Sequence, residues 1–306
     1  MRKITSYVCV ACVGLVLAAG ATSAAVPTPV LQYLFNETGV YATNTGSLAG
    51  GDLLMKTQDR IDPLHPITEV DLHSVDGGGL TGEAGDRNFN NYDQWRGTAQ
   101  MTEDMNELDN LQSFTIAGWY RTDTKPSTTE NWRFASKQGF DLLTMAADVA
   151  TSKFQLRLSI AGTKANASYN SNLATYAYDN TWVFFAVTWD GSDPYNPGTF
   201  YVGSENNAVT AAGGGTTTTD LGVTGDFAAK FTVGNTFGSL GRPALANMDD
   251  IAMWTTKSGG AGALNAAQLE EYRQSTLNPV PEPGSLAMLG TSVLGCGLAI
   301  IRRRKQ

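Results

Sequence analysis

Cysteine and histidine are scarce in this chain. Its three cysteines, Cys9, Cys12 and Cys296, all lie near the two ends of the 306-residue sequence, and there are only two histidines. The long central part therefore cannot form a disulfide, so its stability must come from packing, hydrogen bonds or a bound metal ion. A Ser-His-Asp catalytic site is disfavoured as well, because histidine is rare and no Gly-x-Ser-x-Gly motif is present.

Positive charge is also sparse. The chain has 21 Lys and Arg residues against 29 Asp and Glu residues. Six of the basic residues stand at the ends, which leaves 15 against 29 and a net charge of -14 for the rest. These six are Arg2, Lys3, Arg302, Arg303, Arg304 and Lys305. Such an acidic body argues against nucleic acid and anionic membrane surfaces as partners, and it suits a secreted protein able to bind cations.

Long apolar runs occur only at the two ends. At the N-terminus, Arg2 and Lys3 precede an apolar stretch over 4–19, and small residues follow over 22–25. This order of charged, apolar and small residues is typical of a secretory signal peptide, which we place at 1–25.

The C-terminal end has a different order. The tripeptide Pro281-Glu282-Pro283 precedes an apolar run over 286–301, and Arg302, Arg303 and Arg304 follow directly. As a helix, this run of about 16 residues would measure about 24 Å, against about 30 Å for a bilayer core. Flanking residues can extend it, so we expect one short transmembrane segment at about 284–301. The basic end should stay in the cytoplasm, which leaves the body of the chain outside.

This tail resembles the sorting domain of PEP-CTERM proteins, which occur in Gram-negative bacteria that make extracellular polysaccharide. The resemblance rests on the tripeptide, the apolar run and the arginines, and it covers 278–306. It implies that an exosortase recognises Pro281, Glu282 and Pro283, after a signal peptidase has removed the N-terminal segment. The protein would be anchored in the inner membrane before processing and would then reach the cell surface or the medium.

The body, 26–277, has the pattern of one all-β domain. Phe154, Leu156, Leu158 and Ile160 alternate with polar residues, which predicts a half-buried strand. The stretches 114–120 and 182–189 are continuously apolar, which predicts central strands covered on both faces. Further strands are expected at 200–202, 230–233 and 251–254, with loops and two or three short strands over 46–97. Asn265 and Gln268 form a capping box for one helix that ends before 278–279.

Four motifs in this body occur in the order found in laminin-G-like, concanavalin A-like jelly-roll domains. They are LQYLFN at 31–36, SFTIAGWY at 113–120, WVFFAVTWD at 182–190 with FYVG at 200–203, and MDDIAMW at 248–254 with LNAAQLEEY at 264–272. The chain is therefore identified as a member of this group. The resemblance implies an antiparallel two-sheet jelly-roll sandwich, placed between the N-terminal signal peptide and the C-terminal hydrophobic helix.

Asp249 and Asp250 are the leading metal candidates, since relatives of this fold often hold calcium near the closing strand. Asn36, Asn44 and Asp190 are possible co-ligands, because Ca²⁺ prefers six to eight oxygen ligands. The alternative is that one aspartate is solvated and the other caps a turn. A zinc site at His65 and His73 is not supported, because their spacing fits no closed zinc motif.

Two kinds of carbohydrate chemistry are possible on such a fold. Glucanases need paired carboxylates, as in E-x-D-x-x-E, and the nearest stretch, Glu103 to Glu107, has the wrong spacing. Structural packing is the favoured role for aromatic rings outside the strand patterns, and sugar binding through exposed rings is the alternative. The candidates in polar surroundings are Trp95, Trp132, Tyr92, Tyr176, Tyr178 and Tyr195, whereas Trp119, Trp182, Trp189 and Trp254 are expected in the core.

These observations predict an exported, surface-sorted protein that binds or adheres without catalysing a reaction. Its expected ligand is polysaccharide or extracellular matrix, which rests on the resemblance alone. A polysaccharide-active glycoside hydrolase and a purely structural surface protein are the alternatives. Two carboxylates facing each other across a groove would distinguish the hydrolase, whereas aromatic and amide side chains in that groove would distinguish the binder.

Overall fold

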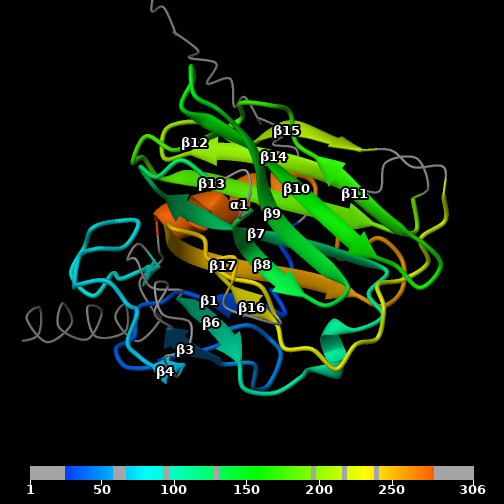
Figure 1. Cartoon of the computed structure of the whole chain (residues 1–306), viewed down its shortest axis with the longest axis horizontal. Coiled ribbons are helices and arrows are strands. Elements are labelled where there is room, and N and C mark those ends of the chain that lie inside the picture. Colours follow the sequence, from blue (N-terminus) through cyan, green and yellow to red (C-terminus); the bar gives the residue numbers. More distant parts are fainter. Residues whose placement is uncertain are drawn as a thin grey trace, which may run out of the picture.

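The computed structural model describes residues 25–57, 67–91, 97–126, 131–193, 198–215, 219–237 and 241–278. Two antiparallel sheets pack face to face and form the two layers seen in Figure 1. In that view, strands of the larger sheet lie in front and the one α-helix of the described residues lies behind. The predicted all-β jelly-roll sandwich is therefore confirmed.

The smaller sheet contains the two strands that the sequence predicts to be covered on both faces. Its members are β1 (Leu31–Tyr33), β5 (Phe89–Asn90), β7 (Ser113–Arg121), β13 (Val183–Asp190), β14 (Gly198–Ser204), β15 (Thr210–Gly215) and β17 (Asn247–Thr256). The order is β1-β17-β7-β13-β14-β15, with β5 paired to β17. Strands β7 and β13 are central, and nearly all their residues are buried, so this prediction is confirmed.

The larger sheet continues the sandwich on the other side of the core. Its members are β2 (Tyr41–Ala42), β3 (Leu53–Thr57), β4 (Thr68–Glu69), β6 (Thr98–Met101), β8 (Arg133–Lys137), β9 (Phe140–Asp148), β10 (Lys153–Ala161), β11 (Asn166–Asn170), β12 (Tyr176–Ala177) and β16 (Thr232–Val233). The order is β11-β10-β9-β8-β16-β6-β3-β2, with β12 paired to β10 and β4 to β3. Strand β10 has the predicted alternation, since every second side chain is buried.

The core between the sheets is rich in aromatic rings. Phe134 lies 5.1 Å from both Tyr120 and Phe185, measured between ring centroids, and Phe114 lies 4.9 Å from Phe140. Tilted and edge-on arrangements such as these add to the free energy of burying the rings. The four tryptophans predicted in strands are all buried, namely Trp119, Trp182, Trp189 and Trp254.

Helix α1 (Ala266–Leu277) covers the outer face of the smaller sheet. Its N-cap is Asn265, whose side chain accepts from the backbone of Gln268 while Gln268 bonds back to the cap, so the predicted capping box is confirmed. Under the helix lie Trp119, Phe184 and Trp254, which pack with Leu269 and Tyr272 in a second apolar cluster. This cluster explains why the central strands are apolar on both sides.

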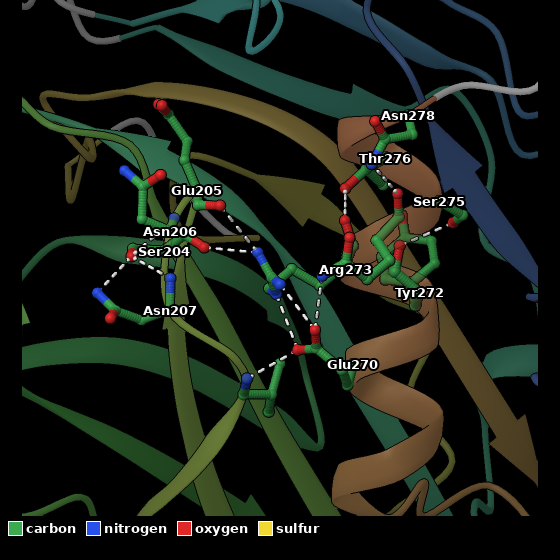
Figure 2. A network of polar contacts seen from close by, with 12 residues as sticks. Ser204, Glu205, Asn206, Asn207, Glu270, Tyr272, Arg273, Ser275, Thr276 and Asn278 are labelled. Carbon is green, nitrogen blue, oxygen red and sulfur yellow. Dashed lines mark hydrogen bonds and ion pairs between the residues drawn. The ribbon is translucent and has the colours of Figure 1, made fainter. Parts of the chain in front are cut away.

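An arginine in the last turns of α1 ties the helix to the hairpin of β14 and β15 (Figure 2). Arg273 is 2% exposed, and it donates to Ser204 O at 2.6 Å and to Glu270 Oε1 at 2.7 Å. Glu270 also accepts from the backbone of Val209 at 2.8 Å. The helix is thus held by charged hydrogen bonds at its rim and by apolar packing beneath it.

The sequence prediction was less complete elsewhere. The hairpin of β8 and β9, the edge strands β11 and β15 and the 3₁₀ turn Asn106–Leu108 were not anticipated. Alternation in β9 is interrupted by the adjacent buried residues Leu142 and Leu143, and β8 has a register shift between Arg133 and Ala135. Over 46–97, the described residues contain three short strands, β3, β4 and β5, as expected.

The two ends of the chain lie outside the described residues. This includes the predicted signal peptide, the tripeptide Pro281-Glu282-Pro283, the apolar run and Arg302, Arg303 and Arg304. Within the described part, no helix has the length and apolar character needed to cross a membrane.

Candidate functional site

The outer face of β8, β9, β10 and β11 is lined mainly by polar side chains. Because Phe154, Leu156, Leu158 and Ile160 of β10 point into the core, Gln155, Arg157 and Ser159 must point outward. The strand register then decides which side chains of the neighbouring strands stand beside them.

Two rows of side chains cross this face from strand to strand. In the first row, Ser159 stands between Ser168 and Asp141, and Asp141 pairs in register with Ser136. In the second row, Arg157 stands between Asn170 and Leu143, and Leu143 pairs with Arg133. Neighbouring strands are about 4.8 Å apart, so each row offers hydrogen-bonding groups at regular spacing.

A pocket of about 440 Å³ adjoins the first row at the hairpin end of β8 and β9. Its polar lining includes Asp141, Ser159, Ser168 and Asn166, and Phe237 forms one wall. Asp141 is the only carboxylate among the described lining residues. The pocket therefore has the hydroxyl and amide groups that a sugar needs, without the pair of carboxylates that glycoside hydrolysis requires.

The surroundings of Asp141 shift the pKa of its carboxyl group and hold it in place. Burial raises the pKa of Asp141, while hydrogen bonds from Ser136 and the charge of Arg133 oppose this shift. The Ser136 hydroxyl donates to Asp141 Oδ1, and Arg133 Nε lies 3.5 Å from Asp141 Oδ2. Both contacts fix the carboxylate in place on the open face.

A second pocket, of about 470 Å³, lies beside β17, where the aspartate pair Asp249 and Asp250 was predicted to bind metal. The register of β17 on β7 shifts between Asp249 and Ala252, so one extra residue bulges out there. Asp250 sits in this bulge with φ of 47°, a backbone region that aspartate tolerates better than most residues. Gly118 faces the bulge, and Ile251 leaves no space for a side chain at that glycine.

The two aspartates have different roles in this bulge. The carboxylate of Asp249 accepts from the backbone N–H of Leu80 at 2.8 Å and of Asp250 at 2.9 Å, so it fixes the bulge to loop 79–86. Asp250 lines the pocket, and no donor among the described residues reaches its carboxylate. Burial raises the pKa of Asp250 to about 8, and the charge of Asp86 adds to the shift.

The structure brings some of the predicted co-ligands to Asp250 and not others. Asn36 lines the same pocket, and its Oδ1 accepts from Arg87 N at 2.9 Å. Asn44 does not line it, because its amide bonds to the backbone of Gln32, Gly46, Leu48 and Gly50 and holds its own loop. Asp190 instead caps a turn through Ser192.

Sequence reasoning missed Asp86, which lines this pocket and faces Asp250. Its Oδ2 accepts from Thr81 N and the Thr81 hydroxyl, both at 2.6 Å. A glycine-rich loop gives no periodic signal, so nothing in the sequence linked Asp86 to the closing strand. Within the described residues, no group of three or more His, Cys, Asp or Glu side chains is arranged to hold a metal ion.

The two histidines do not form a site together in the described residues. His65 lies outside them, and the side chain of His73 is fully buried between two carboxylates. His73 Nδ1 lies 2.8 Å from Asp71 Oδ1, and Nε2 lies 3.7 Å from Glu37 Oε2. Burial alone would lower the pKa of His73, but its contacts with Glu37 and Asp71 raise it. His73 thus lies between two acids, and its contacts with them favour the charged form of the imidazole.

The predicted sugar-binding aromatics are not confirmed. Trp132 is 3% exposed and belongs to the core, so the expectation of an exposed ring was wrong there. Tyr176 is fully buried and Tyr178 is partly buried against the same core. The remaining candidates, Trp95, Tyr195 and Tyr92, lie outside the described residues.

Comparisons with known proteins agree with this architecture. A family profile described as the concanavalin A-like lectin/glucanases superfamily matches residues 96–261, and the profile of the PEP-CTERM protein-sorting motif matches 279–305. The second match indicates an exported protein that an exosortase processes. No curated protein sequence matches the chain.

Solved structures are similar in fold. Domain 4 of AbnA, a GH43 extracellular arabinanase from Geobacillus stearothermophilus solved with arabinotriose, has 12% identity and a TM-score of 0.51, covering 80% of this chain and 98% of that one. The binding domain of botulinum neurotoxin DC, solved with rat synaptotagmin II, has 14% identity and a TM-score of 0.45. This second match covers 81% of the chain but 52% of the neurotoxin domain, so the chain spans about half the length of such domains.

Proposed function

Because the chain belongs to the concanavalin A-like lectin/glucanases superfamily, we propose that it is an exported, non-catalytic carbohydrate-binding protein. Its ligand lies on the outer face of β8 to β11, beside the 440 Å³ pocket. The observation that carries this proposal is the pair of polar rows on the outer face of the sheet, where Ser159, Ser168 and Asn170 are at least partly exposed.

The side chains on this face suit a glycan. Ser159 and Ser168 have their hydroxyl oxygens 3.1 Å apart, and Asn170 accepts from Arg157 Nε at 2.9 Å. Hydroxyl and amide groups held in this way can donate to and accept from sugar hydroxyls.

Glycan-array binding of the exported protein tests the proposal. We expect binding to a defined set of glycans, and a loss of about tenfold or more, equal to about 1.4 kcal/mol, in the double variant Asn166→Ala, Ser168→Ala. Asn206→Ala, in the exposed turn between β14 and β15, is the matched control and should bind normally. A folded protein that binds no glycan in any condition would contradict the proposal.

A structural calcium ion at the second pocket forms part of the same proposal. Asp250 and Asp86 would hold the ion, with Asn36 beside them, because carboxylate and amide oxygens are what Ca²⁺ prefers. The supporting observation is the Asp250 carboxylate, which no donor among the described residues reaches and which lies near the carboxylate of Asp86. A cation there would offset this repulsion and fix the bulge of β17.

Thermal unfolding in calcium and in EDTA tests the ion. We expect calcium to raise the Tm of the wild type and to leave the Tm of Asp250→Asn unchanged. Asparagine also tolerates a positive φ, so this variant removes charge without adding backbone strain. Asp148→Asn, at the exposed tip of the β9–β10 hairpin, is the control and should keep the response. Equal Tm values for the wild type in calcium and EDTA would rule the ion out.

The facing carboxylates of Asp86 and Asp250 also favour a second candidate function, a polysaccharide hydrolase. Glycoside hydrolysis needs two carboxylates about the scissile bond, and Asp86 and Asp250 supply two in this pocket. Release of reducing ends from a bound glycan, lost in Asp250→Asn, would support the hydrolase. Binding without release would support the lectin-like function.

A further inference from the structure

Phe237 is a partly exposed aromatic residue in the lining of the 440 Å³ pocket on the outer face of β8 to β11. The other phenylalanine among the described lining residues, Phe140, is buried in the core. The backbone N–H of Phe237 donates to the Ser136 hydroxyl at 3.2 Å, and its carbonyl accepts from Gln100 Nε2 at 3.1 Å. Two hydrogen bonds to the sheet therefore hold Phe237 at the wall of the pocket.

Ser136 also links Phe237 to the carboxylate of Asp141. The Ser136 hydroxyl accepts from Phe237 N and donates to Asp141 Oδ1. Arg133 Nε lies 3.5 Å from Asp141 Oδ2, which makes it an ion-pair partner but not a hydrogen-bond donor to that oxygen. The side chain of Asp141 is 24% exposed, and no hydrogen bond from the described residues reaches Oδ2. This oxygen therefore keeps its capacity to accept from a ligand in the pocket.

The charges of the described residues at this pocket are paired. Asp141 has Arg133 as its counter-charge, and Lys137, which also lines the pocket, has its Nζ 2.9 Å from the buried Asp109. The other polar side chains of the lining are uncharged, namely Gln138, Ser159, Asn166 and Ser168. An anionic ligand would meet the carboxylate of Asp141, and a cationic ligand would meet the guanidinium beside it. The pocket therefore favours a ligand without charge.

We propose that Phe237 and Asp141 form a subsite for one neutral sugar ring, which packs its C–H face on Phe237 and donates its hydroxyls to Asp141. This inference rests on the proposed carbohydrate-binding function and names the class of sugar for the same pocket. An ionised carboxylate only accepts hydrogen bonds, so its partner has to supply donors, and sugar hydroxyls do so without adding charge. An aromatic wall beside a few convergent polar groups suits a ring that is apolar on one face and polar at its edge.

A glycan array with matched triplets tests the class of sugar. For each hexose, the array presents the neutral sugar, the amino sugar with a free ammonium group and the uronic acid. We expect the exported protein to bind neutral members about tenfold or more tightly than their charged counterparts. Binding of an amino or uronic form as tightly as the matching neutral form would overturn the neutral subsite.

Variants of the two residues test their roles on a bound neutral glycan. Phe237→Ala keeps both backbone hydrogen bonds but removes the ring, and Asp141→Asn removes the charge at nearly constant shape. Each should weaken binding about tenfold or more in a protein that circular dichroism shows to be folded. The matched controls are Tyr41→Ala, an exposed ring on β2 at the far edge of the same sheet, and Asp148→Asn, at the other end of β9. Both controls should bind like the wild type.

The pH dependence of binding distinguishes an acceptor role of Asp141 from a structural one. Burial raises the pKa of Asp141 above its ordinary value of 3.8, while Ser136 and Arg133 oppose the shift. Arg242 lies beyond Arg133, and the lining residues of β10 and β11 do not titrate. Binding should be full above the raised pKa and should weaken as the pH falls through it, whereas Asp141→Asn should lack this step. Identical pH profiles would overturn the acceptor role.

The outcomes separate the inference from the proposed function. Glycan binding that is unchanged in Phe237→Ala and in Asp141→Asn would overturn the subsite and leave carbohydrate binding standing. A folded protein that binds no member of the array would overturn both.

Discussion

The two outer faces of the sandwich differ sharply although both follow the same strand geometry. On the smaller sheet, Trp119, Phe184 and Trp254 point outward and are sealed by α1 and by the N-terminal segment, where Pro27 accepts from Trp254 Nε1 at 2.7 Å. On the larger sheet, Ser159 and Arg157 occupy equivalent outward positions and stay open. Stability is therefore concentrated on the covered face, and ligand recognition is expected on the open one.

Disrupting the packing of the covered face should have the largest effect on the free energy of unfolding. Trp119 is fully buried, its ring centroid lies 5.4 Å from that of Phe184, and its Nε1 donates to Thr276 at 2.9 Å. We expect Trp119→Ala to lower the free energy of unfolding by about 3–5 kcal/mol, because it leaves a large cavity beneath α1. Urea denaturation measures this. A loss below about 1 kcal/mol would mean that the helix does not seal this face in solution.

Buried ion pairs of Lys137 stabilise the sheet that carries the open face, and a second variant tests their contribution to stability. Lys137 of β8 is fully buried, and its Nζ lies 3.0 Å from Asp104 and 2.9 Å from Asp109. Lys137→Met would leave these carboxylates without their cation, and we expect a loss of about 3–5 kcal/mol in urea. Lys230→Met, which removes a half-buried cation whose Nζ donates to the Thr102 carbonyl, is the control. Similar losses in both variants would show that the effect is not due to the buried pair.

The charged hydrogen bonds at the rim of the covered face should contribute less to the free energy of unfolding than the apolar packing at its centre. Arg273→Met keeps the apolar stem but removes the charged bonds to Ser204 and Glu270. We expect a loss of about 1–3 kcal/mol, the range for hydrogen bonds to charged groups, measured by urea denaturation. Gln274→Ala, one residue further along the helix, should cost much less. Equal losses would contradict the special role of Arg273.

Acid should weaken this rim in a defined pH window. The hydrogen bonds from Arg273 lower the pKa of Glu270 to about 2, from an ordinary value of 4.5. The stability that this group contributes is therefore complete above pH 4.5 and is lost as the pH falls toward 2. The Tm of the wild type should fall more steeply across this window than that of Arg273→Met. Parallel curves of Tm against pH for the two proteins would show that Glu270 does not cause the loss of stability in acid.

The smallest effect on stability is expected on the open face. Arg157→Gln should change the free energy of unfolding by no more than about 0.5 kcal/mol, as for other surface substitutions, while it weakens glycan binding. Urea denaturation and binding measured on the same sample test the separation. A loss of stability as large as that of Arg273→Met would show that this face is also structural.

Much of the fold could be read from local patterns. The alternation in β10, the continuous apolar runs of β7 and β13 and the capping box at Asn265 all predict the elements observed. The hairpin of β8 and β9 was missed because Leu142 and Leu143 break the alternation. Exposure was misjudged for Trp132, since polar neighbours in sequence say little about which side of a strand a ring occupies.

The candidate sites were less predictable than the fold. Asp250 was identified from its place on the closing strand, but Asp86, which faces it, stands 164 positions earlier in the numbering and has no sequence signal. The two polar rows of the open face join residues of β8, β9, β10 and β11 through strand register. Neither grouping is visible without knowledge of the pairing.

The amino-acid sequence by itself determined the class of fold, the capped helix at 266–277 and the resemblance of the tail to a sorting signal, because periodicity, capping and motif order are local properties of a chain. Only the tertiary structure decided which face of each sheet is covered, which charges meet and where a pocket forms. Those features depend on the register between strands far apart in sequence, and a shift of one residue in that register would turn every side chain to the opposite face.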